Sequence, residues 1–129
     1  MECIIQAQNL DVGYGKNAVI SDVNIDAMKG QVICLLGPNG AGKSTILRTL
    51  SGLLAPVKGA VRVEGIEIKK MKTKEIAQKI SLVLTDSVAP SLTTVYELIS
   101  MGRTPYTNFL GRLSDEDKKI IDESLEIVG

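Results

Sequence analysis

The sequence predicts an α/β fold in which a glycine-rich loop connects a buried strand to a helix. Three neighbouring segments carry this prediction. Residues 31–36 form a short apolar run, which is typical of a buried strand in a parallel sheet. Residues 46–54 repeat apolar side chains at helical spacing. Between these segments lies the loop, which reads Gly37-Pro38-Asn39-Gly40-Ala41-Gly42-Lys43-Ser44-Thr45.

The loop matches the phosphate-binding pattern G-x-x-x-x-G-K-[ST]. Backbone N–H groups converge on crowded phosphate oxygens only where the chain curls tightly, and glycine tolerates such a curl. Lys43 supplies a positive charge for the β- and γ-phosphates, and the Ser44 hydroxyl suits Mg²⁺. The positive end of the following helix adds to the attraction. We therefore expect the loop to bind a nucleoside triphosphate with Mg²⁺.

Composition predicts one soluble globular domain. The 129 residues are 44% hydrophobic and 23% charged, and no apolar run approaches the roughly 20 residues of a membrane helix. Basic and acidic residues number 15 each, so the net charge gives no support to a nucleic-acid partner. Histidine is absent, which removes it as a base, metal ligand or switch. Cys3 and Cys34 lack metal-ligand spacing, and we expect Cys34 to be buried in its strand.

Two strands are expected before the loop. Partial alternation predicts a first strand over 2–9, and the glycines within 10–17 predict a turn. Residues 18–28 predict a second strand that pairs antiparallel with the first. Tyr14, in the predicted turn, has two interpretations: a tyrosine of the core or turn, or an aromatic face on which a base stacks. Spacing alone does not decide between them.

Helices and strands alternate after the loop. The expected elements are a helix over 43–54 that ends before Pro56, a hairpin or bend around Glu64-Gly65, a short helix over 73–79 with Thr73 as a possible N-cap, a buried strand over 80–84 and a loop over 85–92. A further helix begins at Thr93 or Thr94, and residues 102–113 are expected to be irregular. Ser114, followed by acidic residues, is expected to cap a final helix.

Several segments together resemble the ATP-binding cassette (ABC) transporter ATPases. The loop has the Walker A form typical of that family. Tyr14 lies at the distance upstream where the family places an adenine-stacking aromatic residue, which favours the base-stacking interpretation. Gly59 and Gly65 are spaced as in the family's G-x-V-x-x-x-G hairpin, and residues 94–106 resemble the start of its helical subdomain. Residues 102–106 and 114–117 are most similar to the importer ATPases for iron-siderophore, haem and cobalamin.

The resemblance implies a P-loop NTPase-like ABC core. Residues 1–92 would form the nucleotide-binding core with its antiparallel β subdomain, and residues 93–129 the start of the helical subdomain. The implied cofactors are ATP and Mg²⁺, bound by Tyr14 and the Walker A loop, with Lys43 stabilising transition-state charge. The implied partners are a second ATPase subunit, as a homodimer, and transmembrane permease subunits. The location would be cytoplasmic and peripheral, on the inner face of the cell membrane.

Two departures from the family pattern affect this expectation. Where the family has its Q-loop glutamine, which contacts Mg²⁺ and the attacking water, this sequence has Thr85-Asp86, and threonine is too short to span the same distance. The signature motif, the Walker B aspartate, the catalytic glutamate and the switch histidine would all follow the position of Gly129. We therefore expect an N-terminal portion of an ATPase, whether cut deliberately or truncated naturally. It should bind nucleotide weakly, hydrolyse it negligibly and self-associate.

Two functions remain open at this point. The resemblance favours the ATP-binding portion of an importer ATPase that powers uptake of an iron chelate, haem or cobalamin. The missing catalytic motifs favour a nucleotide-binding or interaction module without turnover. A small P-loop kinase fits poorly, because the expected antiparallel strands before the loop are unlike those enzymes.

Overall fold

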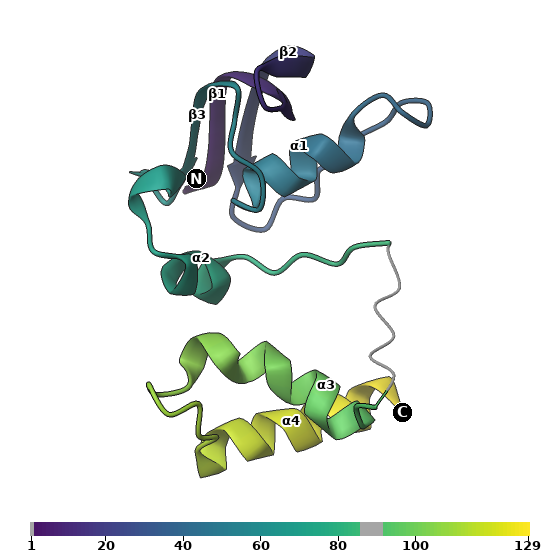
Figure 1. Cartoon of the computed structure of the whole chain (residues 1–129), viewed down its shortest axis with the longest axis vertical. Coiled ribbons are helices and arrows are strands. Elements are labelled where there is room, and N and C mark those ends of the chain that lie inside the picture. The colour runs from purple at the N-terminus through teal and green to yellow at the C-terminus, as the bar shows by residue number, and fades with distance from the viewer. Residues whose placement is uncertain (1, 86–91) are drawn as a thin grey trace. The chain divides into compact units, whose positions relative to one another are not determined.

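The computed structural model describes residues 2–85 and 92–129, which form two compact units (Figure 1). The first unit spans Met1–Ser81 and the second spans Leu82–Gly129. The loop expected over 85–92 falls mainly on residues 86–91, outside the described part. The expected division into residues 1–92 and 93–129 stays a prediction.

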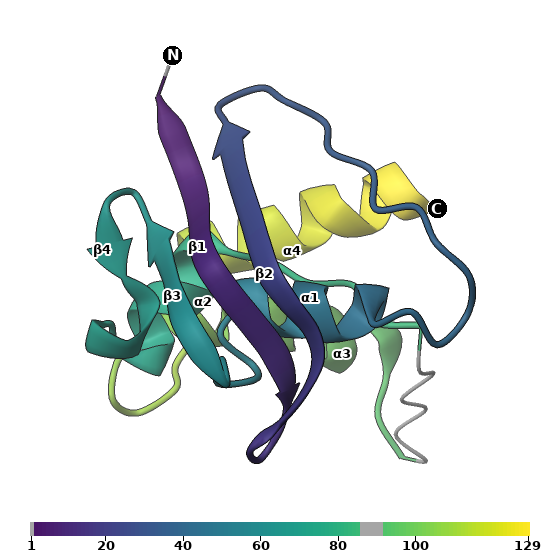
Figure 2. The same cartoon turned by 90° about the horizontal axis from the view of Figure 1, so that it is seen from above.

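A four-stranded antiparallel sheet organises the first unit, in the order β2-β1-β3-β4 (Figure 2). A tight turn at residues 15–16 joins the two long strands, and a second turn at residues 64–65, where both φ angles are positive, joins the two short ones. The predicted antiparallel strand pair and the predicted hairpin are thus confirmed. The strand bounds are β1 Cys3–Tyr14, β2 Asn17–Met28, β3 Lys58–Val63 and β4 Ile66–Glu67.

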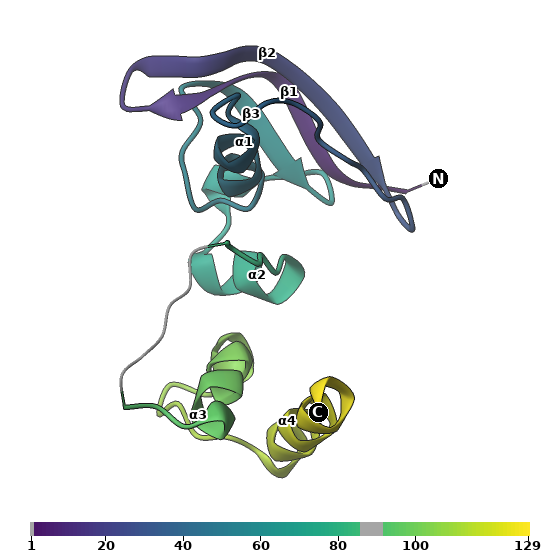
Figure 3. The same ribbon diagram turned by 90° about the vertical axis from the view of Figure 1, so that its right-hand side faces the viewer.

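Helix α1 (Lys43–Leu50) lies against one face of this sheet (Figure 3). Its buried Ile46 joins Leu10 and Val12 of β1 in the core cluster, together with apolar residues of β3. The predicted turn over 10–17 is therefore too early, because β1 continues to Tyr14 and buries Leu10 and Val12 completely. This packing fixes the start of α1 beside the β1–β2 hairpin.

The predicted end of the helix at residue 54 is also wrong. Gly52 adopts φ 79°, and its N–H donates to the Thr49 carbonyl at 3.2 Å, which ends α1 in a left-handed cap. After the 3-10 turn η1 (Ile68–Lys70), helix α2 spans Thr73–Lys79 as predicted, but its N-cap is Lys72 and not Thr73. The Lys72 N–H donates to the Glu75 carboxylate at 2.7 Å, which replaces the predicted threonine cap.

Two predicted buried strands, over 31–36 and 80–84, are wrong. Both segments have irregular backbone, and neither pairs with any strand among residues 2–85 and 92–129. A strand exists only where a neighbouring backbone takes up its N–H and C=O groups, so an apolar run alone does not make one. Leu36 is 93% exposed and Val83 is 95% exposed. Cys34 is likewise exposed, which corrects the prediction that it is buried.

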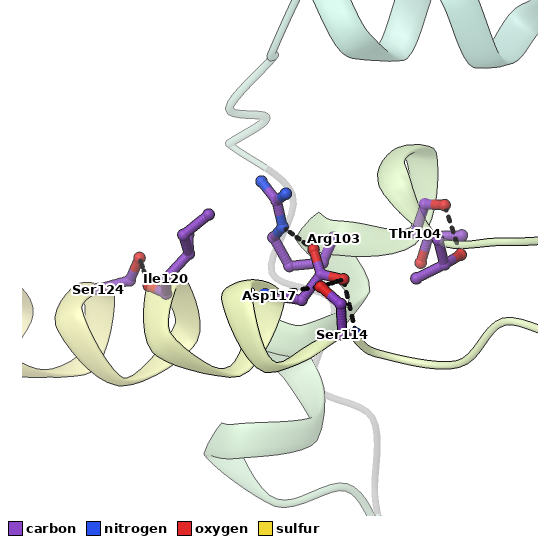
Figure 4. A network of polar contacts seen from close by, with 7 residues as sticks. Arg103, Thr104, Ser114, Asp117, Ile120 and Ser124 are labelled. Atoms are coloured by element: carbon purple, nitrogen blue, oxygen red, sulfur yellow. Dashed lines mark hydrogen bonds and ion pairs between the residues drawn. The ribbon is translucent and has the colours of Figure 1, made fainter.

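The second unit contains α3 (Val95–Ser100), the 3-10 helix η2 (Met101–Tyr106) and α4 (Asp115–Val128). Thr94 and Ser114 cap α3 and α4 as predicted, each with an acidic partner in the first turn. Part of the segment expected to be irregular, 102–113, forms η2 instead. Arg103 of η2 reaches Asp117 of α4, and this ion pair joins the two elements (Figure 4).

Candidate nucleotide-binding site

The glycine-rich loop curls tightly at the point where α1 begins. Gly40 has φ 84° and Gly42, the N-cap, has φ 95°, a region that side chains disfavour. The Ala41 N–H donates to the Pro38 carbonyl at 3.2 Å, which closes the turn. No side chain of the described residues caps α1 at this end. The first-turn N–H groups are therefore open to an anion.

Lys43 folds back over this loop. Its Nζ donates to the Gly37 carbonyl at 2.6 Å and to the Pro38 carbonyl at 2.7 Å. The ammonium is thereby held at the loop and is not extended into solvent. Phosphate oxygens, which bear full negative charge, are stronger acceptors than these carbonyls and would compete for the same protons.

A pocket of about 390 Å³ brings the predicted aromatic residue and the loop together. Tyr14 and Val19 contribute from the β1–β2 hairpin, and the remaining lining comes from the loop and the start of α1. Gly42 allows this close approach, because a Cβ there would lie 2.7 Å from Ile20 Cδ1 of β2. The loop residues that line the pocket are Asn39, Gly40, Gly42, Lys43, Ser44 and Thr45.

Tyr14 lies at the end of β1 and lines the pocket beside the start of α1. The nearby polar side chain of Thr45, and after it that of Arg48, lowers the pKa of the Tyr14 phenol. The residue is nevertheless 53% exposed. Sequence reasoning missed both Val19 and Arg48. Arg48 could have been noticed, because it lies three residues after Thr45 and so shares its helix face.

The two candidate metal ligands, Ser44 and Thr85, belong to different units of the chain. Ser44 is exposed beside the pocket, so its hydroxyl is free to meet a Mg²⁺ ion carried by a nucleotide. Thr85 is exposed and belongs to the second unit. Within residues 2–85 and 92–129, no group of three or more His, Cys, Asp or Glu side chains is placed to hold a metal ion.

Comparison with known proteins gives the family. The profile of the ABC transporter family matches residues 20–129. This chain belongs to the ABC transporter family. No helix in the part of the chain that the structure describes has the length and apolar character needed to cross a membrane.

Two curated relatives of this ABC chain are ATP-binding proteins of Bacillus subtilis (strain 168). The iron(3+)-hydroxamate import ATP-binding protein is 44% identical over 125 residues, which cover 97% of this chain and 46% of the relative. A probable siderophore transport system ATP-binding protein is 38% identical over 122 residues, covering 95% of this chain and 44% of the relative. The chain thus spans somewhat less than half the length of these relatives.

The fold class predicted from the sequence is confirmed. An ATP-binding cassette solved as a dimer in a post-hydrolysis state, bound to ADP and Pi, superposes with a TM-score of 0.78. It shares 24% identity, over 95% of this chain and 56% of the other. This ABC chain therefore has the ABC ATPase architecture over its own length, with the antiparallel sheet and the loop-to-helix junction described above.

Proposed function

We propose that this chain is the ATP-binding part of an ABC importer ATPase and that residues 37–45 bind the phosphates of Mg·ATP. The observation that carries the proposal is the pocket that joins Tyr14 to the Walker A loop. An aromatic ring and a phosphate-binding loop in the lining of one pocket match the two chemically distinct ends of a nucleotide. Family membership supports the same assignment.

Each lining group has a role that follows from its chemistry. The open N–H groups at the start of α1 donate to phosphate oxygens. Lys43 exchanges the carbonyls of Gly37 and Pro38 for the β- and γ-phosphates and stabilises charge there. The Ser44 hydroxyl would be one ligand of Mg²⁺, which when bound supplies further positive charge between the phosphates. The ring of Tyr14 stacks on the adenine.

The activity of the whole protein is proposed from its relatives. The two Bacillus subtilis proteins are named for iron(3+)-hydroxamate import and for siderophore transport. We therefore propose that the whole protein couples ATP hydrolysis to uptake of an iron chelate, with haem and cobalamin as further candidate cargoes. It would act as a dimer with transmembrane permease subunits, on the cytoplasmic face of the membrane. Thr85 is proposed to stand at the Q-loop position without the reach of a glutamine.

Calorimetric titration of the chain with Mg·ATP tests this proposal through Lys43. Replacing Lys43 with alanine removes a charge-assisted contact of about 1.5–3 kcal/mol, so the affinity should fall about 10- to 150-fold. Lys119→Ala is a matched control, because Lys119 is an exposed lysine of α4 that pairs only weakly, at 3.7 Å, with Glu123. It should leave the affinity unchanged. Equal affinities of the wild-type and Lys43→Ala chains would contradict a phosphate-binding role for the loop.

A further inference from the structure

We propose that Asn39 is a site of spontaneous deamidation, where attack by the backbone nitrogen of Gly40 converts the side-chain amide into a carboxylate and thereby weakens nucleotide binding. Of the five asparagines in the chain, Asn39 is the one that glycine follows. The covalent step depends on the loop alone. Its effect on binding rests on the proposed function above.

The reaction takes water as its co-reactant. The Gly40 nitrogen loses its proton to hydroxide and attacks Cγ of Asn39, so that a new C–N bond closes a succinimide ring. The side-chain nitrogen of Asn39 leaves as ammonia. Water then opens the ring at either carbonyl, which yields aspartate or the isomer whose backbone runs through the side chain. In total, an amide and water give a carboxylate and ammonium, and the loop gains a negative charge.

Both reacting groups are free in the loop. Asn39 and Gly40 are exposed and lie in the turn that the Ala41 N–H closes on the Pro38 carbonyl, at 3.2 Å. Toward the described residues, 2–85 and 92–129, neither the Asn39 side chain nor the Gly40 N–H makes a hydrogen bond. The amide and the nitrogen therefore give up no protein partner when they meet.

Gly40 favours the attack because it leaves its nitrogen open. Its φ is 84°, and nothing lies within 4 Å of the position that a Cβ would take. A side chain at this position would shield the nitrogen and restrict the backbone, whereas glycine does neither. Asn17 gives the contrast within the same chain. It is also exposed, but Ala18 follows it, and both residues are held in β2 by pairing with β1.

The product places negative charge where the proposed site requires positive potential. Asn39 lines the pocket together with Lys43 and Ser44. A carboxylate at this position repels the phosphates and competes with them for Lys43 and for the open N–H groups at the start of α1. Bound Mg·ATP should in turn slow the deamidation, because a loop N–H that donates to phosphate is harder to deprotonate.

Peptide mass spectrometry tests the covalent step without any nucleotide. The chain is incubated at mildly alkaline pH and digested with trypsin, and the fragment of residues 30–43 is sequenced at intervals. We expect Asn39 to gain the mass that exchanging NH₂ for OH adds, in two isomers, while Asn17 stays an amide. Gly40→Ala should slow the gain about 10-fold. No gain at Asn39, an equal rate at Asn17, or an unchanged rate in Gly40→Ala would overturn the proposal.

Charge variants test the effect on binding. Asn39→Asp has the charge of the product and should lower the calorimetric affinity for Mg·ATP on the order of 10-fold. Asn108→Asp is the matched control, because it adds the same charge in the second unit and its carboxylate still accepts from the N–H groups of Leu110 and Arg112. It should leave the affinity unchanged, and saturating Mg·ATP should slow the mass gain of the wild-type chain.

The two parts of the proposal fail separately. Equal Mg·ATP affinities of the wild-type and Asn39→Asp chains, an equal loss in Asn108→Asp, or a deamidation rate that Mg·ATP leaves unchanged would overturn the effect on binding. If fresh wild-type chain did not bind Mg·ATP, the proposed function itself would fail. The mass gain would still decide whether Asn39 deamidates.

Discussion

The carboxylate of Asp117 makes several polar contacts at the start of α4. Its carboxylate accepts hydrogen bonds from the Ser114 N–H at 2.9 Å and the Ser114 hydroxyl at 2.7 Å, and it pairs with Arg103 Nε at 2.8 Å (Figure 4). One carboxylate therefore caps α4 and joins it to η2. Arg103 also lies over the ring of Tyr106, with its Cζ 4.1 Å from the ring centroid, so the guanidinium is held from two sides.

This arrangement predicts a pH dependence of stability. The contacts from Ser114, and after them the one from Arg103, lower the pKa of Asp117 from 3.8 to about 2. A carboxyl whose folded-state pKa is depressed stabilises the fold above its unfolded pKa and loses that contribution as the pH falls. The loss should therefore occur between about pH 4 and about pH 2. Urea unfolding followed by helical circular dichroism at several pH values measures it.

Asp117→Asn is the control for this pH dependence, because asparagine keeps the shape and does not titrate in this range. The stability difference between the chain and the variant should be largest above about pH 4 and should shrink toward about pH 2. A difference that stayed constant over this interval would show that the Asp117 carboxylate is not the titrating group.

At the scale of elements, the pairing of β1 with β3 depends on the absence of a side chain at Gly59. A Cβ on Gly59 would lie 2.3 Å from the Asn9 carbonyl oxygen and 2.6 Å from that of Gln8, both of the β1 backbone. Gly59→Ala should therefore push the strands apart, in addition to the cost of about 1–2 kcal/mol for its φ of 81°. The expected result is a marked fall in the urea midpoint of the first unit.

Gly65→Ala is the matched control for this clash. Gly65 has nearly the same φ, 79°, but nothing lies within 4 Å of an added Cβ. Gly65→Ala should cost only about 1–2 kcal/mol, the amount that a side chain at positive φ requires. If the two variants unfolded at the same urea concentration, the close approach of β1 and β3 at Gly59 would not govern stability.

Local sequence signals predicted the elements that depend on local chemistry. Thr94 and Ser114 cap their helices as expected, because a capping box is made within four neighbouring residues. Gly13 and Gly15 both suggested a turn, but only Gly15 has a positive φ. Gly13 stays in β1, where a Cβ would meet the Asn17 carbonyl oxygen at 1.9 Å. The sequence alone does not distinguish a glycine that a turn requires from a glycine that allows two backbone segments to approach closely.

Sequence patterns gave fewer correct predictions where the structure depends on residues that are distant in the chain. The runs 31–36 and 80–84 have strand-like composition, but composition does not supply the adjacent backbone that a strand requires. The Walker A loop was predictable because its residues are contiguous. Val19 was not, because its relation to the loop exists only after the hairpin and α1 have packed. Whether Tyr14 and residues 37–45 bind nucleotide remains a prediction.

At the scale of the whole molecule, the exposed apolar side chains predict self-association. Val32 and Leu36 are 88% and 93% exposed in a segment whose backbone pairs with no strand among the described residues. Such segments offer both apolar surface and unpaired N–H and C=O groups to a second copy. Sedimentation velocity should therefore show association that increases with concentration, and serine at both positions should reduce it.

Ile127→Ser serves as the control for the self-association experiment. Ile127 is 84% exposed, but it lies on α4, whose backbone groups are satisfied within the helix. Its substitution should leave association nearly unchanged. A chain that sedimented as a monomer at all concentrations would contradict this prediction, and an equal effect of Ile127→Ser would contradict its assignment to the 31–36 segment.

The central claim is that Tyr14 and the Walker A loop together form one nucleotide site. The most direct measurement follows the backbone amides of ¹⁵N-labelled chain by NMR during a titration with Mg·ATP. We expect the largest shift changes at the amides of pocket-lining residues, those of Gly40, residues 42–45 and Tyr14, because phosphate and base would lie against them. Tripolyphosphate should move the loop amides and leave Tyr14 in place. Shift changes confined to other parts of the chain, or none with Mg·ATP, would contradict the claim.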